Sequence, residues 1–180
     1  MSVTYDGIVN AQKIQGDIIR KTSLTFSDTF SQLTGSTVYL KNEFEQKTGS
    51  FKLRGAYYKI KTLTEDERKK GVVAASAGNH AQGVAFAAAL EKISCTIVMP
   101  INASPAKVAA TRGYGATVIL EGKNYDESWI KAQEIAKTND STIIHAFDDS
   151  QIISAQGVIG LEIIEQLPDV DEIYVPIGGG

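Results

Sequence analysis

The stretch GVVAASAGNHAQG, residues 71–83, joins a short apolar run, a turn that contains glycine and the start of a helix. Four further apolar, β-branched runs occur at residues 94–99, 116–120, 141–146 and 172–177, and helical patterns separate them. Apolar runs that are continuous rather than alternating are typical of strands in a parallel sheet, because such a sheet is buried on both faces. The sequence therefore predicts an α/β fold.

The segments between these runs carry helix start and stop signals. Thr64 and Glu67 have the spacing of a capping box, and Gly71 can end the helix that they begin. Ser104 precedes a proline at a first helical position, and Gly113 can close that second helix. These residues predict helix boundaries and need no functional explanation.

Two other regions have recognisable patterns. Residues 124–139 predict an amphipathic helix, whose apolar side chains available to a sheet are Trp129, Ile130, Ile135 and Ala136. Before residue 71 the pattern changes, with helices predicted near residues 6–21 and 27–34 and a strand near residues 37–42. This N-terminal part could pack with elements after His145 and form a second lobe.

Composition excludes several classes of function. The chain of 180 residues is 43% hydrophobic and 22% charged, as is typical of globular proteins. A net charge of -3 supplies no basic field for nucleic acid. Since the sequence has neither a membrane-spanning apolar run nor a signal peptide pattern, we expect a cytoplasmic protein without a membrane partner. The single cysteine, Cys95, allows no intramolecular disulfide, and we expect it to be buried.

Lys52 is the first candidate for chemistry, in the run EQKTGSFKLRGA at residues 45–56. Phe51 and Leu53 flank it, a Thr-Gly-Ser turn precedes it, and a helix is predicted to start there. A lysine in such apolar surroundings can lose its proton and act as a nucleophilic amine.

Two glycine-rich segments support this interpretation. Residues 76–83 and 177–180 each follow an apolar run, so their backbone N–H groups can approach an anion such as a phosphate. Together with Lys52 they suggest a phosphorylated carbonyl cofactor. The alternative for Asn79 is that it only caps the helix over residues 80–91. His80 is interpreted as a local hydrogen-bonding residue and His145 as a buried structural one, and the sequence predicts no metal site.

In order along the chain, SFKLRGA at residues 50–56, SAGNHAQG at residues 76–83, HAFDD at residues 145–149 and the terminal glycines resemble the fold-type II pyridoxal-phosphate enzymes. Threonine dehydratases (threonine ammonia-lyases) and serine dehydratases or racemases are the most similar. The resemblance implies a tryptophan synthase β-like fold of two lobes, each with a mainly parallel open sheet. Residues 46–146 would form the smaller lobe, and residues 1–45 and 147–180 part of the larger, cofactor-binding lobe. Because the chain stops within a glycine run, we expect it to be a fragment with an incomplete second lobe.

The resemblance also implies roles for individual residues. Lys52 would be the Schiff-base lysine, Phe51 would pack against pyridoxal 5'-phosphate, and Asn79 would bind its ring hydroxyl. The substrate-binding residues would be Ser76, Gly78, Asn79 and His80, and the phosphate-binding loop would begin with Gly178, Gly179 and Gly180.

The reaction implied by the resemblance is β-elimination from L-threonine, L-serine or both, which gives 2-oxobutanoate or pyruvate and ammonia. Such a lyase would act on small amino acids, as in isoleucine biosynthesis, and would be a homodimer or homotetramer. Serine racemisation, β-replacement and non-catalytic binding of a small molecule are the alternatives. Racemases of this family tend to carry a serine where this chain has Ala77, which favours elimination.

Overall fold

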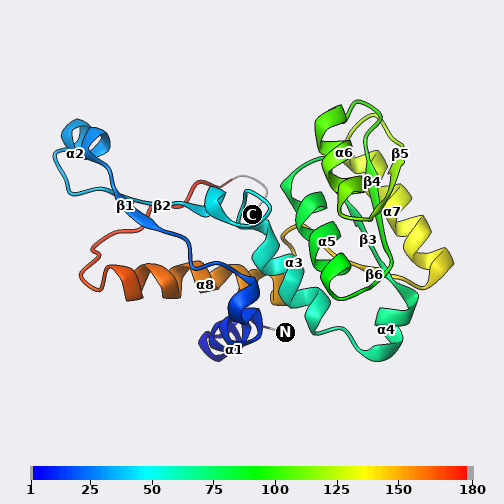
Figure 1. The fold of residues 1–180 in the computed structure, drawn as a ribbon, viewed down its shortest axis with the longest axis horizontal. Helices are drawn as coiled ribbons and strands as arrows, with labels where there is room; N and C mark the ends of the chain where they lie inside the picture. The colour runs from blue at the N-terminus through cyan, green and yellow to red at the C-terminus, as the bar shows by residue number, and fades with distance from the viewer. Residues whose placement is uncertain (1, 178–180) are drawn as a thin grey trace.

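The computed structural model describes residues 2–177. The body at the right of Figure 1 is built around a four-stranded, entirely parallel sheet in the order β5-β4-β3-β6. The strands are β3 (Val72–Ala75), β4 (Cys95–Met99), β5 (Thr117–Leu120) and β6 (Thr142–Ile143). The predicted α/β fold with a buried parallel sheet is therefore confirmed, although β6 is shorter than expected. The prediction of a strand at residues 172–177 is wrong, because within the described chain no strand pairs with this exposed segment.

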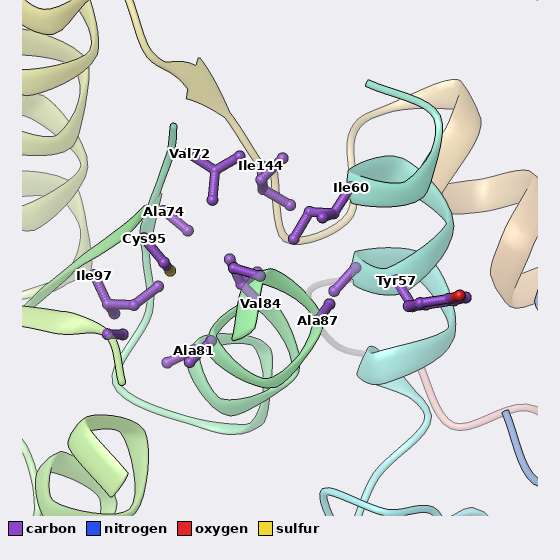
Figure 2. Close-up of a cluster of buried hydrophobic side chains, with 14 of the residues drawn as sticks. Tyr57, Ile60, Val72, Ala74, Ala81, Val84, Ala87, Cys95, Ile97 and Ile144 are labelled. Atoms are coloured by element: carbon purple, nitrogen blue, oxygen red, sulfur yellow. The ribbon is translucent and has the colours of Figure 1, made fainter. Parts of the chain in front are cut away.

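Alternate residues of the central strands pack against different layers. Val72 and Ala74 of β3 face a core that α5 (Asn79–Leu90) and α6 (Pro105–Gly113) cover, as Figure 2 shows for part of this cluster. Val73 and Ala75 face the opposite side, which α7 (Tyr125–Asn139) covers. Cys95 is buried in the first of these cores, and burial raises the pKa of its thiol to about 12, so it is an inert apolar residue as expected.

The helix α3 (Lys52–Lys61) connects this sheet to the rest of the molecule. Leu53, Tyr57 and Ile60 on one side of α3 join the sheet core, where they pack with α5 (Figure 2). Tyr58 on another side joins a separate cluster formed with α1 (Tyr5–Gln15) and α8 (Ser150–Gln166). The sequence analysis did not predict α8, whose N-cap Asp149 accepts hydrogen bonds from the first turn of the helix.

The N-terminal segment extends away from the parallel sheet (Figure 1). After α1 and the short η1 (Gly16–Ile18), the strands β1 (Leu24–Phe26) and β2 (Tyr39–Lys41) form a two-stranded antiparallel ribbon. The helix α2 (Asp28–Thr34), capped by Ser27, joins them, and η2 (Glu43–Glu45) follows β2. The predicted helix at residues 27–34 and strand at residues 37–42 are thus confirmed in shorter form, whereas β1 was not predicted.

The observed ends of the helices can be compared with the capping residues predicted from the sequence. The capping box of Thr64 and Glu67 begins α4 (Glu65–Lys70), and Gly71 ends it, as predicted. The proline after Ser104 is the first residue of α6, but the Ser104 side chain makes no capping hydrogen bond.

Ile130 of α7 is 56% exposed, so the prediction that it faces the sheet is wrong. No helix within residues 2–177 is long and apolar enough to cross a membrane.

Candidate active site

The order of the parallel strands places a topological switch point at their carboxyl ends. Along the chain the sheet grows from β3 through β4 to β5 on one side, and then β6 is added on the other side of β3. The strand order therefore reverses between β3 and β6, and ligands of open α/β sheets bind at such a switch point. The motif of residues 76–80 follows β3, and residues 144–149 follow β6.

Lys52 reaches this switch point from the first turn of α3. Its Nζ atom donates a hydrogen bond of 2.8 Å to the carbonyl oxygen of Ala146 and lies 5.0 Å from the centre of the Phe51 ring. Burial lowers the pKa of the Lys52 ammonium, because the charged form loses hydration. The amine that the sequence singled out therefore lies beside the segment after β6 and has an increased neutral fraction.

The loop after β3 carries polar groups that a ligand can reach, above all the exposed side-chain amide of Asn79. The Oγ atom of Ser76 accepts the N–H of Gly78 at 3.1 Å, and among the described residues a Cβ atom at Gly78 would meet only Lys107 Nζ, at 3.8 Å. The N-cap of α5 is Gly78, while Asn79 is the first helical residue and caps nothing with its side chain. The alternative that Asn79 only caps the helix is therefore wrong. In the described part of the molecule, its exposed side-chain amide has no protein partner.

His80 is buried beneath this loop. Its Nε2 atom lies 2.9 Å from the carbonyl oxygen of Ile144, to which it donates, and Nδ1 has no hydrogen-bond partner within residues 2–177. Burial lowers the pKa of His80 to about 4, so the ring is neutral at pH 7. The side chain of His80 thus joins the segments after β3 and β6, while its backbone N–H lies in the first turn of α5 and has no carbonyl partner within that helix.

A glycine determines how closely α5 approaches Lys52. A Cβ atom at Gly83 would lie 3.2 Å from the backbone N of Leu53 and 3.3 Å from the carbonyl carbon of Lys52. Both contacts are to backbone, which cannot move as a side chain can. Gly83 therefore permits α5 and α3 to pack with the Lys52 backbone in direct contact.

A sequence profile described as "Pyridoxal-phosphate dependent enzyme" matches residues 16–180. The chain belongs to the pyridoxal-phosphate dependent enzyme family. It is 51% identical to an L-threonine ammonia-lyase of Thermotoga maritima, over 99% of this chain and 44% of that protein. It is 52% identical to the catabolic L-threonine dehydratase TdcB of Staphylococcus aureus, over 99% of this chain and 52% of that protein. The chain thus spans about half the length of the curated relatives it matches.

Solved structures of pyridoxal-phosphate dependent enzymes share the fold. Maize serine racemase superposes with a TM-score of 0.96 at 34% identity, over 100% of this chain and 55% of that one. Threonine deaminase isoform 2 from Solanum lycopersicum gives a TM-score of 0.89 at 37% identity, over 100% of this chain and 51% of that one. The fold-type II assignment made from the sequence is confirmed.

The described residues fit the cofactor that gives the family its name. An aldehyde needs an amine with a substantial neutral fraction, and Lys52 is half-buried with a lowered pKa. The open space over Gly78 and the exposed amide of Asn79 leave room and a donor for a polar ligand at the same edge of the sheet. The predicted phosphate loop, Gly178 to Gly180, lies outside the described residues.

Sequence reasoning missed a buried ionic cluster two residues after Lys52. Arg54 is fully buried and binds both oxygens of Glu43, at 2.8 Å each, and both of Glu162, at 2.6 and 2.9 Å. Lys41 Nζ binds Glu162 at 2.6 Å. Burial would lower the pKa of Arg54, but its bonds to Glu43 and Glu162 outweigh burial and raise it. The only signal in the sequence was a charged residue within an otherwise apolar helix start.

A groove of about 550 Å³ lies beside the turn that follows β6. Its lining residues are Phe147, Asp148, Ile153, Gln156 and Gly157. The Nε2 atom of Gln156 is buried without a hydrogen-bond partner in the described part of the chain.

Across residues 2–177, no group of three or more His, Cys, Asp or Glu side chains is placed to hold a metal ion.

Proposed function

We propose that the protein carrying this chain removes ammonia from L-threonine, or from both L-threonine and L-serine, by β-elimination with pyridoxal 5'-phosphate as cofactor. The products are 2-oxobutanoate or pyruvate, with ammonia. The observation that carries the proposal is the Lys52 amine, which burial makes less basic and which lies at the switch point of the sheet. Relatives named threonine ammonia-lyase or dehydratase are 51% and 52% identical over nearly all of the chain, and they support the substrate class.

Pyridoxal phosphate supplies, when bound, an aldehyde that reacts with amines and a conjugated ring that accepts electron density from the substrate α-carbon. Lys52 is the residue that holds the cofactor and then removes the α-proton at Nζ. A lower pKa favours the neutral amine that this step requires. The Ala146 carbonyl, 2.8 Å away, accepts a hydrogen bond from Nζ and stabilises the ammonium that results.

The loop after β3 binds the rest of the substrate in this proposal. The first N–H groups of α5, including that of His80, have no carbonyl partner within the helix and can donate to a carboxylate. Ser76 and Gly78 shape this loop, and the Asn79 amide binds the hydroxyl of the cofactor ring. Phe51 packs beside the cofactor, and Gly178, Gly179 and Gly180 start the phosphate-binding loop.

Serine racemisation is the second candidate, because maize serine racemase is among the similar structures. Racemisation needs a proton donor on each face of the α-carbon, and the methyl group of Ala77 cannot exchange a proton. Elimination needs only one such group. In the full-length protein, release of 2-oxobutanoate from L-threonine without formation of D-serine from L-serine distinguishes the two reactions.

On the basis of the family resemblance, we also propose how the chain is divided into lobes and how the full protein assembles. Residues 46–146 form the smaller lobe, and residues 1–45 and 147–180 contribute to the larger one. The full protein is a cytoplasmic homodimer or homotetramer in amino acid metabolism. Its molar mass, measured by light scattering, tests the oligomeric state.

The cofactor assignment is tested by reduction and mass mapping. The chain is mixed with pyridoxal phosphate and reduced with borohydride, and the added phosphopyridoxyl mass is located by peptide mass spectrometry. We expect label at Lys52, unchanged in Lys47→Ala and absent in Lys52→Ala. Lys47 lies in the same motif but before the helix, so it controls for the loss of a nearby lysine. Equal labelling of exposed lysines throughout the chain would contradict the assignment.

A further inference from the structure

Two side chains of the proposed site hold the backbone after β6. His80 Nε2 donates to the carbonyl of Ile144 at 2.9 Å, and Lys52 Nζ donates to the carbonyl of Ala146 at 2.8 Å. These carbonyls are two residues apart in the segment between β6 and α8. The direction of the second carbonyl is therefore one of the features that position the Lys52 amine.

The side chain between these two carbonyls organises the turn that follows. His145 Nδ1 accepts the backbone N–H of Phe147 at 3.2 Å and that of Asp148 at 2.8 Å. Because Nδ1 accepts two N–H groups, it carries no proton in this arrangement. The same pattern, a side-chain acceptor for the N–H groups two and three residues later, stabilises Asx turns. The expectation that His145 is simply a buried structural residue is wrong, since the ring is only half-buried.

Aromatic neighbours hold the His145 ring in this orientation. Trp129 of α7 meets it edge to face at 5.0 Å and an interplanar angle of 81°, and Phe147 does so at 4.7 Å and 82°. Tyr125 stacks on Trp129 at 6.4 Å. The ring therefore has two separable properties: its shape, which packs among aromatic residues, and its Nδ1 acceptor, which closes the turn.

We propose that His145 is a positioning residue for Lys52. Its Nδ1 atom closes the turn over residues 145–148 and so directs the Ala146 carbonyl at the amine. The peptide between Ala146 and Phe147 carries both groups: its N–H donates to His145, and its carbonyl oxygen accepts from Lys52. Since a peptide group is planar, fixing its N–H also fixes its carbonyl. This inference rests on the proposed function of Lys52 as the reacting amine.

A pair of substitutions separates the two properties of His145. His145→Phe keeps a ring for the aromatic contacts and removes the acceptor. His145→Asn removes the ring, but its Oδ1 atom is as many bonds from the backbone as Nδ1 and can accept from the same N–H groups. If the acceptor matters, Asn preserves the position of the carbonyl and Phe does not. A role in packing alone predicts the reverse.

The test measures Lys52 directly and needs no cofactor. The rate of acetylation of Lys52 by acetic anhydride is followed against pH by peptide mass spectrometry, with Lys47 as internal reference. The titratable groups on the elements that meet here include Lys52 and Lys59 of α3, His80 of α5, Tyr125 of α7, and His145, Asp148 and Asp149 in the turn. All except His145 are unchanged in both variants. Circular dichroism establishes that each variant is folded.

In His145→Phe we expect the pKa of Lys52 to fall by about half a unit, because the ammonium loses a directed acceptor. Hydrogen exchange of the Phe147 and Asp148 amides should become faster in the same variant. His145→Asn should match the unsubstituted chain in both measurements. An unchanged or raised pKa in His145→Phe, or equal shifts in the two variants, would overturn the proposal. Failure of pyridoxal phosphate to label Lys52 would instead contradict the proposed function and leave these rates measurable.

Discussion

At the scale of single residues, burial disfavours the charged forms of both Lys52 and His80. Each side chain donates to a backbone carbonyl of the segment after β6. A neutral histidine with its proton on Nε2 can make this bond while it occupies an apolar site, whereas an imidazolium would bring a charge into the core. Because the folded chain disfavours the charged form of His80, its stability depends on pH.

The stability of the chain should depend on pH through His80. Its pKa is about 4 in the folded chain and near 6.5 when unfolded, so the unfolded state takes up the proton first as pH falls. We expect a loss of about 2 kcal/mol in the free energy of unfolding between pH 7 and 4.5, measured by urea titration. His80→Gln keeps a neutral N–H donor and should remove this part of the pH dependence. The same pH dependence in both proteins would contradict the assignment.

At the scale of elements, α3 carries Lys52 and is fixed on three sides. Gly83 lets α5 approach its first turn, and the buried Arg54 cluster ties it to η2 and α8. Gly55 lets α8 approach, since a Cβ atom there would lie 2.9 Å from a methyl carbon of Ile152. Close packing and paired charges therefore determine the place of the amine.

Removing Arg54 alone should lower the free energy of unfolding more than removing Arg54 together with the charge of Glu43. Arg54→Leu leaves Glu43 without its bidentate partner, and we expect the free energy of unfolding to fall by about 3 kcal/mol or more. Adding Glu43→Gln removes the unpaired charge and should recover part of the loss, because Lys41 still pairs with Glu162. Urea unfolding of the two single variants and the double variant measures this coupling. If the change in the free energy of unfolding of the double variant equals the sum of the two single changes, Arg54 and Glu43 are not coupled in this way.

Gly83→Ala tests the contact between α5 and α3. The added methyl group meets the backbone of Lys52 and Leu53 at 3.2 to 3.3 Å, so one helix must shift. We expect a loss of about 1 to 3 kcal/mol in stability, together with weaker labelling of Lys52 by pyridoxal phosphate. Gly160→Ala is a matched control in α8, because a Cβ atom there meets nothing within 4 Å. Equal effects of the two substitutions would contradict this role for Gly83.

At the scale of the whole molecule, burial is unevenly distributed. The sheet body buries entire strands such as β3, whereas α2 has no buried residue and β1 and β2 are largely exposed. Phe26, Phe30, Leu33 and Leu40 are all at least 41% exposed along this N-terminal arm. Few buried apolar contacts give a segment low local stability.

Hydrogen exchange should follow this distribution. We expect the backbone amides of residues 24–41 to exchange well before those of β3, β4 and α5, since only the latter need global unfolding to open. Mass spectrometry of peptides after timed exchange measures the difference. Comparable protection of the arm and the sheet would show that the arm is stabilised by contacts other than those described.

The strands illustrate how far sequence reasoning extends. Continuous apolar runs predicted β3, β4 and β5 nearly to the residue, and β3 and β4 are almost entirely buried, whereas β5 at the edge of the sheet is partly exposed. The same reasoning was wrong for residues 172–177, since an apolar run becomes a strand only where another strand is free to pair with it. It also missed α8, whose capping aspartate was noticed only as part of a motif.

The sequence by itself determined the fold class, the family and the choice of Lys52, Ser76 and Asn79, because these depend on local patterns and on motifs along the chain. Only the tertiary structure decided that His80 faces Ile144, that Arg54 lies in a buried ionic cluster and that His145 closes the turn beside Lys52. Each of these roles depends on a partner that the chain brings close only by folding. Burial, charge pairing and hydrogen-bond direction are properties of that proximity, and no residue carries them alone.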